Sequence, residues 1–84
     1  HPDTSQVNRL NEVGFTYWSR DPEKAEQFGK KAKEIADRVG YRQGAADASR
    51  IIGISFWARG NNIEALKFFL ESLNLAQEID YQLG

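Results

Sequence analysis

The chain has no cysteine, only two prolines, a single histidine and no long apolar run among its 84 residues. Without cysteine it can form neither a disulfide nor a thiolate metal site, and its redox compartment is left open. No apolar stretch approaches the roughly 20 residues that a membrane-spanning helix needs, so we expect no membrane insertion. The N-terminal residues also lack the basic, apolar and small-residue order of a signal peptide.

The chain also lacks an excess of charge of either sign. The 11 Lys and Arg residues nearly balance the 12 Asp and Glu residues, which gives a net charge of −1 and no electrostatic footprint for nucleic acid. The only histidine is His1, and no Ser–His or carboxylate pair falls in an expected cleft. We therefore expect no enzyme, no cofactor and no metal site.

What the chain does contain is the same segment twice, about forty residues apart. The matching pairs are Gly14 and Gly53, Trp18 and Trp57, Arg20 and Arg59, and, after a turn one residue longer, Ala25 and Ala65, Phe28 and Phe68, Ala36 and Ala76, Tyr41 and Tyr81, and Gly44 and Gly84. A repeat of this length is one supersecondary unit that buries its apolar face by stacking on a copy of itself. We expect a single domain over residues 1–84, with repeat 1 at about 4–44 and repeat 2 at about 45–84.

Apolar residues recur at spacings of three and four throughout, which predicts an all-α chain. The first helix should run from about Thr4 to Arg20. Asp21-Pro22-Glu23 then marks a new helix start, because Asp caps free N–H groups and Pro suits the first turn. Further helices are expected to about Val39, over about 42–59 and around 65–79. Short connections make neighbours antiparallel, so each repeat is a helical hairpin.

Gly14 and Gly53 lie in the middle of expected helices, where glycine costs about 0.5–1 kcal/mol relative to alanine. The same cost at equivalent places in both copies predicts a close backbone approach, to Ala25 and Ala65 on the partner helices. Large rings would fill the wider levels beside them, at Tyr17 and its counterpart Phe56 and at Phe28 and its counterpart Phe68.

These residues resemble tetratricopeptide (TPR) repeats of a longer, forty-residue variety. The family pattern has a small residue and then an aromatic three later in helix A, and two small residues seven apart in helix B. Here they are Gly14, Tyr17, Ala25 and Ala32, repeated as Gly53, Phe56, Ala65 and Ser72. The resemblance covers essentially the whole chain and implies a right-handed superhelical stack of two antiparallel hairpins. The short turn at Asp21-Pro22 and Gly29, where an aromatic is usual, depart from it.

The resemblance implies a non-catalytic module that binds a protein or peptide. The opening segment DTSQVNRLNEVGFTYWSRDPEKAEQFGKKAKEIA is also similar to the start of TPR regions in bacterial signalling proteins. The alternative function is therefore a sensory or dimerisation segment of a larger protein of histidine kinase or adenylate cyclase type. The compartment stays open between the cytoplasm and, for a bacterial sensor, the periplasm.

In the family, helix A of each repeat lines a binding groove. The corresponding positions here are Asn8, Asn11, Phe15, Trp18 and Ser19 in the first copy, and Asp47, Arg50, Ile54, Trp57 and Ala58 in the second. Trp18 and Trp57 are expected either to stack on a bound segment or only to cover the seam between helices. Arg50 is the only cation of the set, so the clamp by which some TPRs hold an acidic C-terminus is absent.

The two copies differ on one face of their second helices. The last helix carries an apolar strip of Leu66, Phe69, Leu70 and Leu73, where the first copy has Glu26, Gly29, Lys30 and Lys33. An open apolar strip indicates an interface. We expect either a further repeat of a longer parent protein or a second chain, as a homodimer through the C-terminal helix, to cover it.

Overall fold

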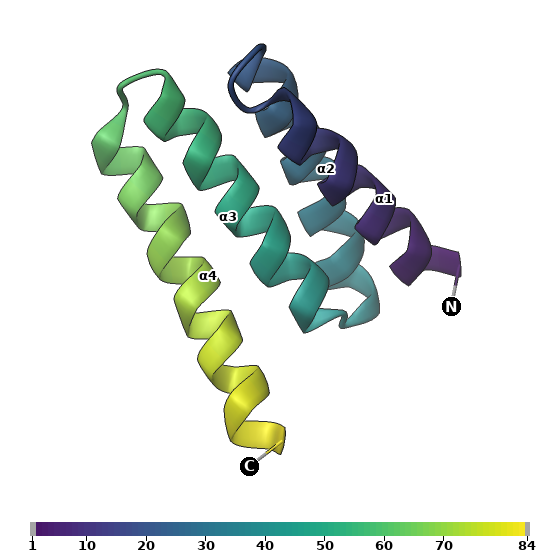
Figure 1. Cartoon of the computed structure of the whole chain (residues 1–84). Coiled ribbons are helices and arrows are strands. Elements are labelled where there is room, and N and C mark those ends of the chain that lie inside the picture. The colour runs from purple at the N-terminus through teal and green to yellow at the C-terminus, as the bar shows by residue number, and fades with distance from the viewer. Residues whose placement is uncertain (1, 84) are drawn as a thin grey trace.

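The computed structural model describes residues 2–83, and within that range the side chains of residues 3–80. This part of the chain contains four helices and no strand (Figure 1): α1 (Pro2–Tyr17), α2 (Pro22–Val39), α3 (Arg42–Ala58) and α4 (Asn62–Leu83). The prediction of an all-α stack of helical hairpins is confirmed. His1, Gly84 and the side chain of Tyr81, on which parts of the repeat prediction fall, lie outside the described set.

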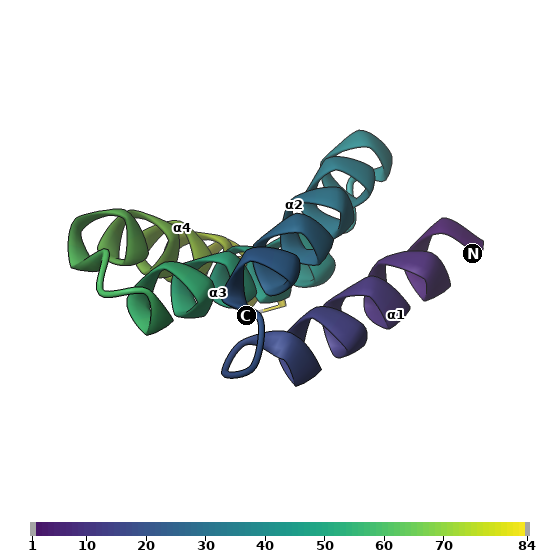
Figure 2. The same cartoon turned by 90° about the horizontal axis from the view of Figure 1, so that it is seen from above.

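The helices form two layers. Each helix packs on the next one along the chain, and α1 also contacts α3. Seen from above, α1 and α3 lie on one side of the molecule and α2 and α4 on the other (Figure 2). The first helices of the two hairpins therefore share one face, on which the predicted groove residues were placed. The right-handed superhelical sense stays a prediction.

Local signals set the ends of α2 as predicted. The Asp21 carboxylate accepts a hydrogen bond from the Lys24 backbone N–H at 3.2 Å, and Pro22 is the first helical residue. Gly40 ends α2 in the left-handed conformation, with a φ of 75°, and Gly60 has a φ of 79° after α3. Such backbone angles favour glycine because it has no Cβ to clash with the following carbonyl.

The first helix is displaced relative to the prediction. It begins at Pro2 and ends at Tyr17, three residues before the expected end at Arg20. The Tyr17 carbonyl accepts hydrogen bonds from the N–H groups of Arg20 at 3.1 Å and Asp21 at 2.8 Å, and these bonds close the turn. The second helix starts at Pro22, directly after Asp21. Trp18 therefore lies in the turn between α1 and α2, outside the helix.

The close helix contacts predicted at Gly14 and Gly53 are confirmed. A Cβ at Gly14 would lie 3.5 Å from the Ala25 carbonyl oxygen, and one at Gly53 would lie 3.2 Å from that of Ala65, so both glycines sit at close helix contacts. Beside them the rings stack in pairs: Tyr17 with Phe28 at 5.9 Å between centroids, and Phe56 with Phe68 at 5.7 Å. Stacked rings add to burial at these wider levels.

The two hairpins meet at the interface of α2 with α3. Here Gly29 faces Ile52 so closely that a Cβ at residue 29 would lie 2.8 Å from an Ile52 side-chain carbon. The departure from the family pattern at this position therefore has a structural reason, which is the approach of α3. Small and aliphatic buried residues continue this core towards α1: Val7, Ala32, Ile35, Ala36, Ala45 and Ala48.

Candidate functional site

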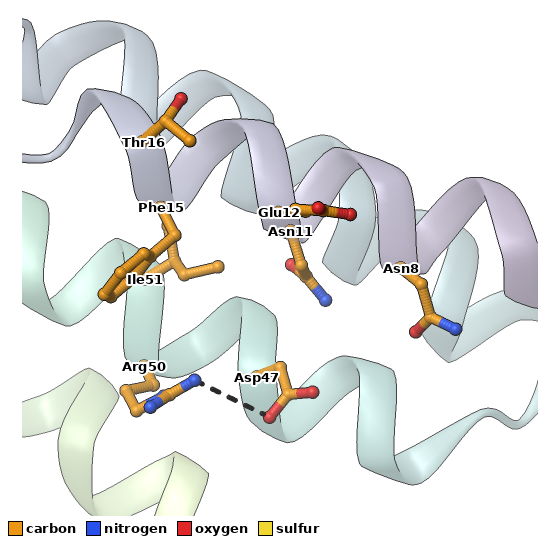
Figure 3. Close-up of a pocket in the computed structure, with 8 residues that line it drawn as sticks. All are labelled: Asn8, Asn11, Glu12, Phe15, Thr16, Asp47, Arg50 and Ile51. Atoms are coloured by element: carbon orange, nitrogen blue, oxygen red, sulfur yellow. Dashed lines mark ion pairs between the residues drawn. The ribbon is translucent and has the colours of Figure 1, made fainter.

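A groove of about 420 Å³ runs between α1 and α3 (Figure 3). Asn8, Asn11, Phe15, Asp47 and Arg50, all predicted from the family positions, line it. The structure adds three lining residues that the prediction did not include: Glu12, Thr16 and Ile51. Glu12 was within reach of sequence reasoning, because it follows Asn8 by one helical turn on the same face.

Asn11 occupies the floor of this groove. Its side chain is only 6% exposed, and its Nδ2 donates a hydrogen bond to the Gly44 carbonyl at 3.1 Å, which ties α1 to the start of α3. That bond also identifies which end of the amide is the nitrogen. The Oδ1 atom is buried and has no hydrogen-bond partner among the described residues. A buried acceptor of this kind is costly unless a partner donates to it.

Around Asn11 the polar groups of the groove are held in place by neighbours. The Tyr41 hydroxyl donates to Asn8 Oδ1 at 2.8 Å, and the Gln43 amide donates to Asp47 Oδ1 at 3.2 Å. Arg50 lies 4.0 Å from the same Asp47 oxygen (Figure 3). These contacts restrict the side chains at one end of the groove, which lowers the entropy lost when a ligand binds there.

The other end of the groove is apolar. Phe15 is 47% exposed and lies beside Ile51, which is buried. Thr16 borders this end, with its hydroxyl donating to the Val13 carbonyl at 2.6 Å. The groove thus offers an apolar wall, a buried acceptor and a mixed charged rim, which suits a segment that combines an apolar side chain with amide N–H groups.

Trp18, Ile54 and Trp57, also predicted for the groove, do not line it. The two tryptophans contact each other, with ring centroids 6.2 Å apart and planes tilted by 44°. Their mutual contact corresponds to the seam-covering alternative, although Trp57 keeps 56% of its surface exposed. The early end of α1 accounts for the position of Trp18, because it places this residue in the turn after the helix.

The apolar face predicted on α4 is exposed. Its large exposed residues are Ile63 at 75%, Leu66 at 58%, Leu70 at 50% and Leu73 at 53%, and these four define the α4 strip. Phe69 was predicted as part of this face, but it is half-buried and is not among the large exposed residues. Its ring packs against Gly53 within the hairpin. Ile63 was missed, but it precedes Leu66 by three residues and continues the same spacing.

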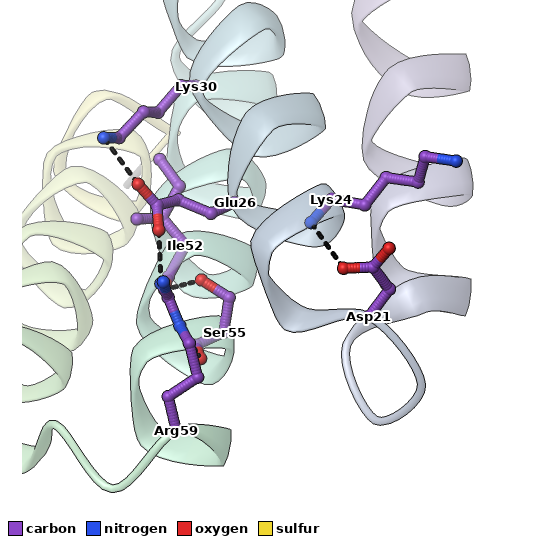
Figure 4. Close-up of polar contacts among 7 residues, drawn as sticks. All are labelled: Asp21, Lys24, Glu26, Lys30, Ile52, Ser55 and Arg59. Atoms are coloured by element: carbon purple, nitrogen blue, oxygen red, sulfur yellow. Dashed lines mark hydrogen bonds and ion pairs between the residues drawn. The ribbon is translucent and has the colours of Figure 1, made fainter.

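A polar link joins the two hairpins away from the groove (Figure 4). Glu26 of α2 pairs with Arg59, which follows α3, and its other carboxylate oxygen lies 2.6 Å from Lys30 Nζ. Burial alone would raise the pKa of Glu26, but hydrogen bonds and charges from Lys30 and Arg59 outweigh it and hold the pKa below its ordinary value. A second link joins Lys33 to Glu71 of α4 at 2.9 Å.

The repeated arginines, Arg20 and Arg59, each lie against an aromatic ring of their own hairpin. Arg59 Nε donates to the Ser55 carbonyl at 3.2 Å, as a cation at a helix end should. Its guanidinium also lies 4.6 Å from the Phe56 ring centroid, and that of Arg20 lies 5.1 Å from the Tyr17 ring. Each arginine therefore makes a cation–π contact with one ring of the aromatic pair in its own hairpin.

Among the described residues no cluster of three His, Asp or Glu side chains could hold a metal ion, and none of the helices has the length and apolar character to cross a membrane. Comparisons with protein-family models, with curated proteins and with solved structures found no match. The TPR resemblance therefore depends on the residues of this chain alone.

Proposed function

We propose that this chain is a non-catalytic interaction module that binds an extended peptide segment in the groove between α1 and α3. The observation that carries the proposal is the buried, unpaired Oδ1 of Asn11 at the groove floor. A backbone N–H of a bound segment is the commonest donor that could satisfy it. The resemblance to TPR repeats supports the same assignment.

The rest of the groove restricts the kind of segment. An apolar side chain of the ligand would cover Phe15, which is large, rigid and half exposed. Glu12 and Asp47 against the single cation Arg50 favour a neutral or weakly basic segment over an acidic one.

The test is a selection of peptides from a random displayed library on the wild-type chain, followed by calorimetric titration of a selected peptide. N-methylation of each peptide nitrogen in turn removes one donor at a time. We expect one methylated position to weaken binding to the wild type about five- to tenfold, the value of one hydrogen bond. The same methylation should have little effect on an Asn11→Ala variant, because the acceptor is already gone.

Asn74→Ala, on the exposed side of α4, is the matched control and should bind like the wild type. Circular dichroism would check that Asn11→Ala stays helical, since it also loses the bond to Gly44. If the selected peptides bind the Asn11→Ala and Phe15→Ala variants as tightly as the wild type, the groove between α1 and α3 is not the peptide-binding site.

The second candidate is a sensory or dimerisation segment of a larger signalling protein, of histidine kinase or adenylate cyclase type. The exposed α4 strip favours it, because an apolar face of this kind indicates an interface. The reading frame of the parent gene discriminates the two: continuation into an output module supports this candidate, and its absence counts against it.

A further inference from the structure

The α4 strip has the spacing of a two-helix seam. Its members, Ile63, Leu66, Leu70 and Leu73, follow one another at intervals of three, four and three residues, which is the a and d pattern of a heptad repeat. The first a position is Ile63 and the second is Leu70, with Leu66 and Leu73 at d; isoleucine at a with leucine at d favours two strands in parallel pairs of helices. No other described helix covers this face, because α4 packs on α3 through other residues, among them Ala65, Phe69 and Ser72.

We propose that α4 pairs with α4 of a second copy of this chain about a two-fold axis, with the α4 strip as the shared interface. The alternative arrangement for two copies is end-to-end stacking, in which the first hairpin of one copy lies on the second hairpin of another. The internal repeat shows what such stacking would bring together, because the second hairpin already lies on the first in this way.

Two ion pairs cross the internal junction between hairpins. Glu26 of α2 meets Arg59, and Lys33 of α2 meets Glu71. On the α4 strip, Leu66 is the counterpart of Glu26 and Leu73 is the counterpart of Lys33. In a stacked second copy, the counterparts of Arg59 and Glu71 are Arg20 and Lys31.

End-to-end stacking would therefore press two exposed cations, Arg20 and Lys31, against two leucines. A charge removed from water without a partner costs far more than the leucine contact returns. Charge complementarity, which holds the internal junction together, thus works against a head-to-tail contact between copies.

Side-chain size gives the same answer. The close approach of α3 to α2 requires a residue without a side chain at position 29, where a Cβ would lie 2.8 Å from Ile52. The counterpart of Gly29 on α4 is Phe69. A helix cannot approach α4 at that position as closely as α3 approaches α2.

A two-fold arrangement avoids both conflicts, because it places the same apolar residues of each copy against one another. It also closes with two copies, whereas a head-to-tail contact leads to open chains of molecules. Lys67, the one charged residue between Leu66 and Leu70 on the sequence, has its ammonium 3.3 Å from Glu64 of the same helix. Its charge is therefore partnered at the edge of the proposed seam.

This interface would give the second candidate function a defined dimer contact, and it does not depend on peptide binding in the groove. A chain that binds peptide but does not dimerise would contradict only the present inference. A chain that dimerises but does not bind peptide would contradict only the proposal of peptide binding in the groove.

The experiment is sedimentation equilibrium of the full chain over a wide range of concentrations. We expect a monomer–dimer equilibrium for the wild type. The triple variant Leu66→Glu/Leu70→Lys/Leu73→Lys, which transplants the first-copy residues Glu26, Lys30 and Lys33, should raise the dimer dissociation constant at least about a hundredfold. The matched control is Trp57→Lys, which removes an equally exposed hydrophobic residue from a different surface and should still dimerise.

A second measurement needs no variant. Cross-linking of amines in the wild type should yield a Lys67–Lys67 product, which only two chains can form. A wild-type monomer throughout the concentration range, open-ended polymers, or a dimer that Trp57→Lys abolishes and the triple variant keeps would each overturn the proposal. If the triple variant fails to fold by circular dichroism, Leu70→Lys alone and the Lys67 cross-link decide the question.

Discussion

At the scale of single residues, close contacts between helices occur at glycines, which have no side chain to hold a neighbour away. Gly29 admits Ile52 of the next hairpin, while Gly53 admits the ring of Phe69 from its own hairpin. Sequence repetition predicted the close approach at Gly53 but said nothing of Gly29, because the second copy has Phe69 there. Only the assembled structure shows that the two positions meet different neighbours.

We predict that Gly29→Ala destabilises the fold by about 1–3 kcal/mol, an overpacking cost larger than the helix-propensity gain of alanine. Ile52 is 1% exposed and has no room to move, and the Ala48 carbonyl would lie 3.3 Å from the new Cβ. Gly53→Ala should cost less, because the half-buried ring of Phe69 can rotate away. Urea denaturation of both variants checks the order, and a larger cost at Gly53 would contradict this account.

For Asn11, too, the sequence predicted one property and the structure shows others. Its place on the groove side of the first helix followed from the family resemblance. Its burial, its bond to Gly44 and its unpaired oxygen arise from the contact of α1 with α3, which residues 33 positions apart make. No local pattern reports on such a contact.

At the scale of elements, local signals predicted helix ends well where a cap is built into the sequence. The start of α2 at Pro22 and its end before Gly40 are examples. The predicted end of α1 at Arg20 was wrong, because no residue near Tyr17 marks the end of a helix. There the turn is set by the following cap at Asp21, whose own N–H returns to the Tyr17 carbonyl at 2.8 Å.

We predict that Asp21→Ala lowers the free energy of unfolding by about 1 kcal/mol, since it removes the side-chain acceptor for the first turn of α2. Asp21→Asn keeps an acceptor and should recover most of the loss. Thermal unfolding followed by circular dichroism measures both. Equal stability of the alanine and asparagine variants would show that the cap contributes nothing.

At the scale of the whole molecule, polar links reinforce the apolar junction between the hairpins. Desolvation opposes the charge of Lys33, but bonds to Glu71 and Asp37 outweigh it and raise its pKa. The pKa of Glu26 is lowered instead, for the reason given above. A lowered carboxyl pKa contributes stability above the unfolded value and loses it in acid, whereas a raised lysine pKa contributes below the unfolded value and loses it in alkali. Both links therefore act together at neutral pH.

We predict that Glu26→Gln costs about 0.5–1 kcal/mol at neutral pH, as expected for a partly exposed ion pair. The difference from the wild type should shrink as the pH falls below the ordinary value of 4.5 and through the lowered pKa of Glu26, because the wild-type carboxyl then loses its charge as well. Glu34→Gln, an equal charge change on an exposed part of α2, is the control and should be nearly neutral. A Glu26→Gln deficit that stays constant into acid would exclude the ion pair as its cause.

The sequence by itself determined the helices, their pairing into hairpins and the glycine and ring levels inside each hairpin, because spacing, caps and short turns act over a few residues. Five groove positions and the exposed face of the last helix also followed from the repeat and the family resemblance. Only the tertiary structure decided that Trp18 and Trp57 contact each other, that Asn11 is buried with one atom unpaired, and that opposite charges cross the junction between hairpins. These depend on how far apart two helices come to rest, and that distance is set by side chains distant in the chain that pack together only in the folded molecule.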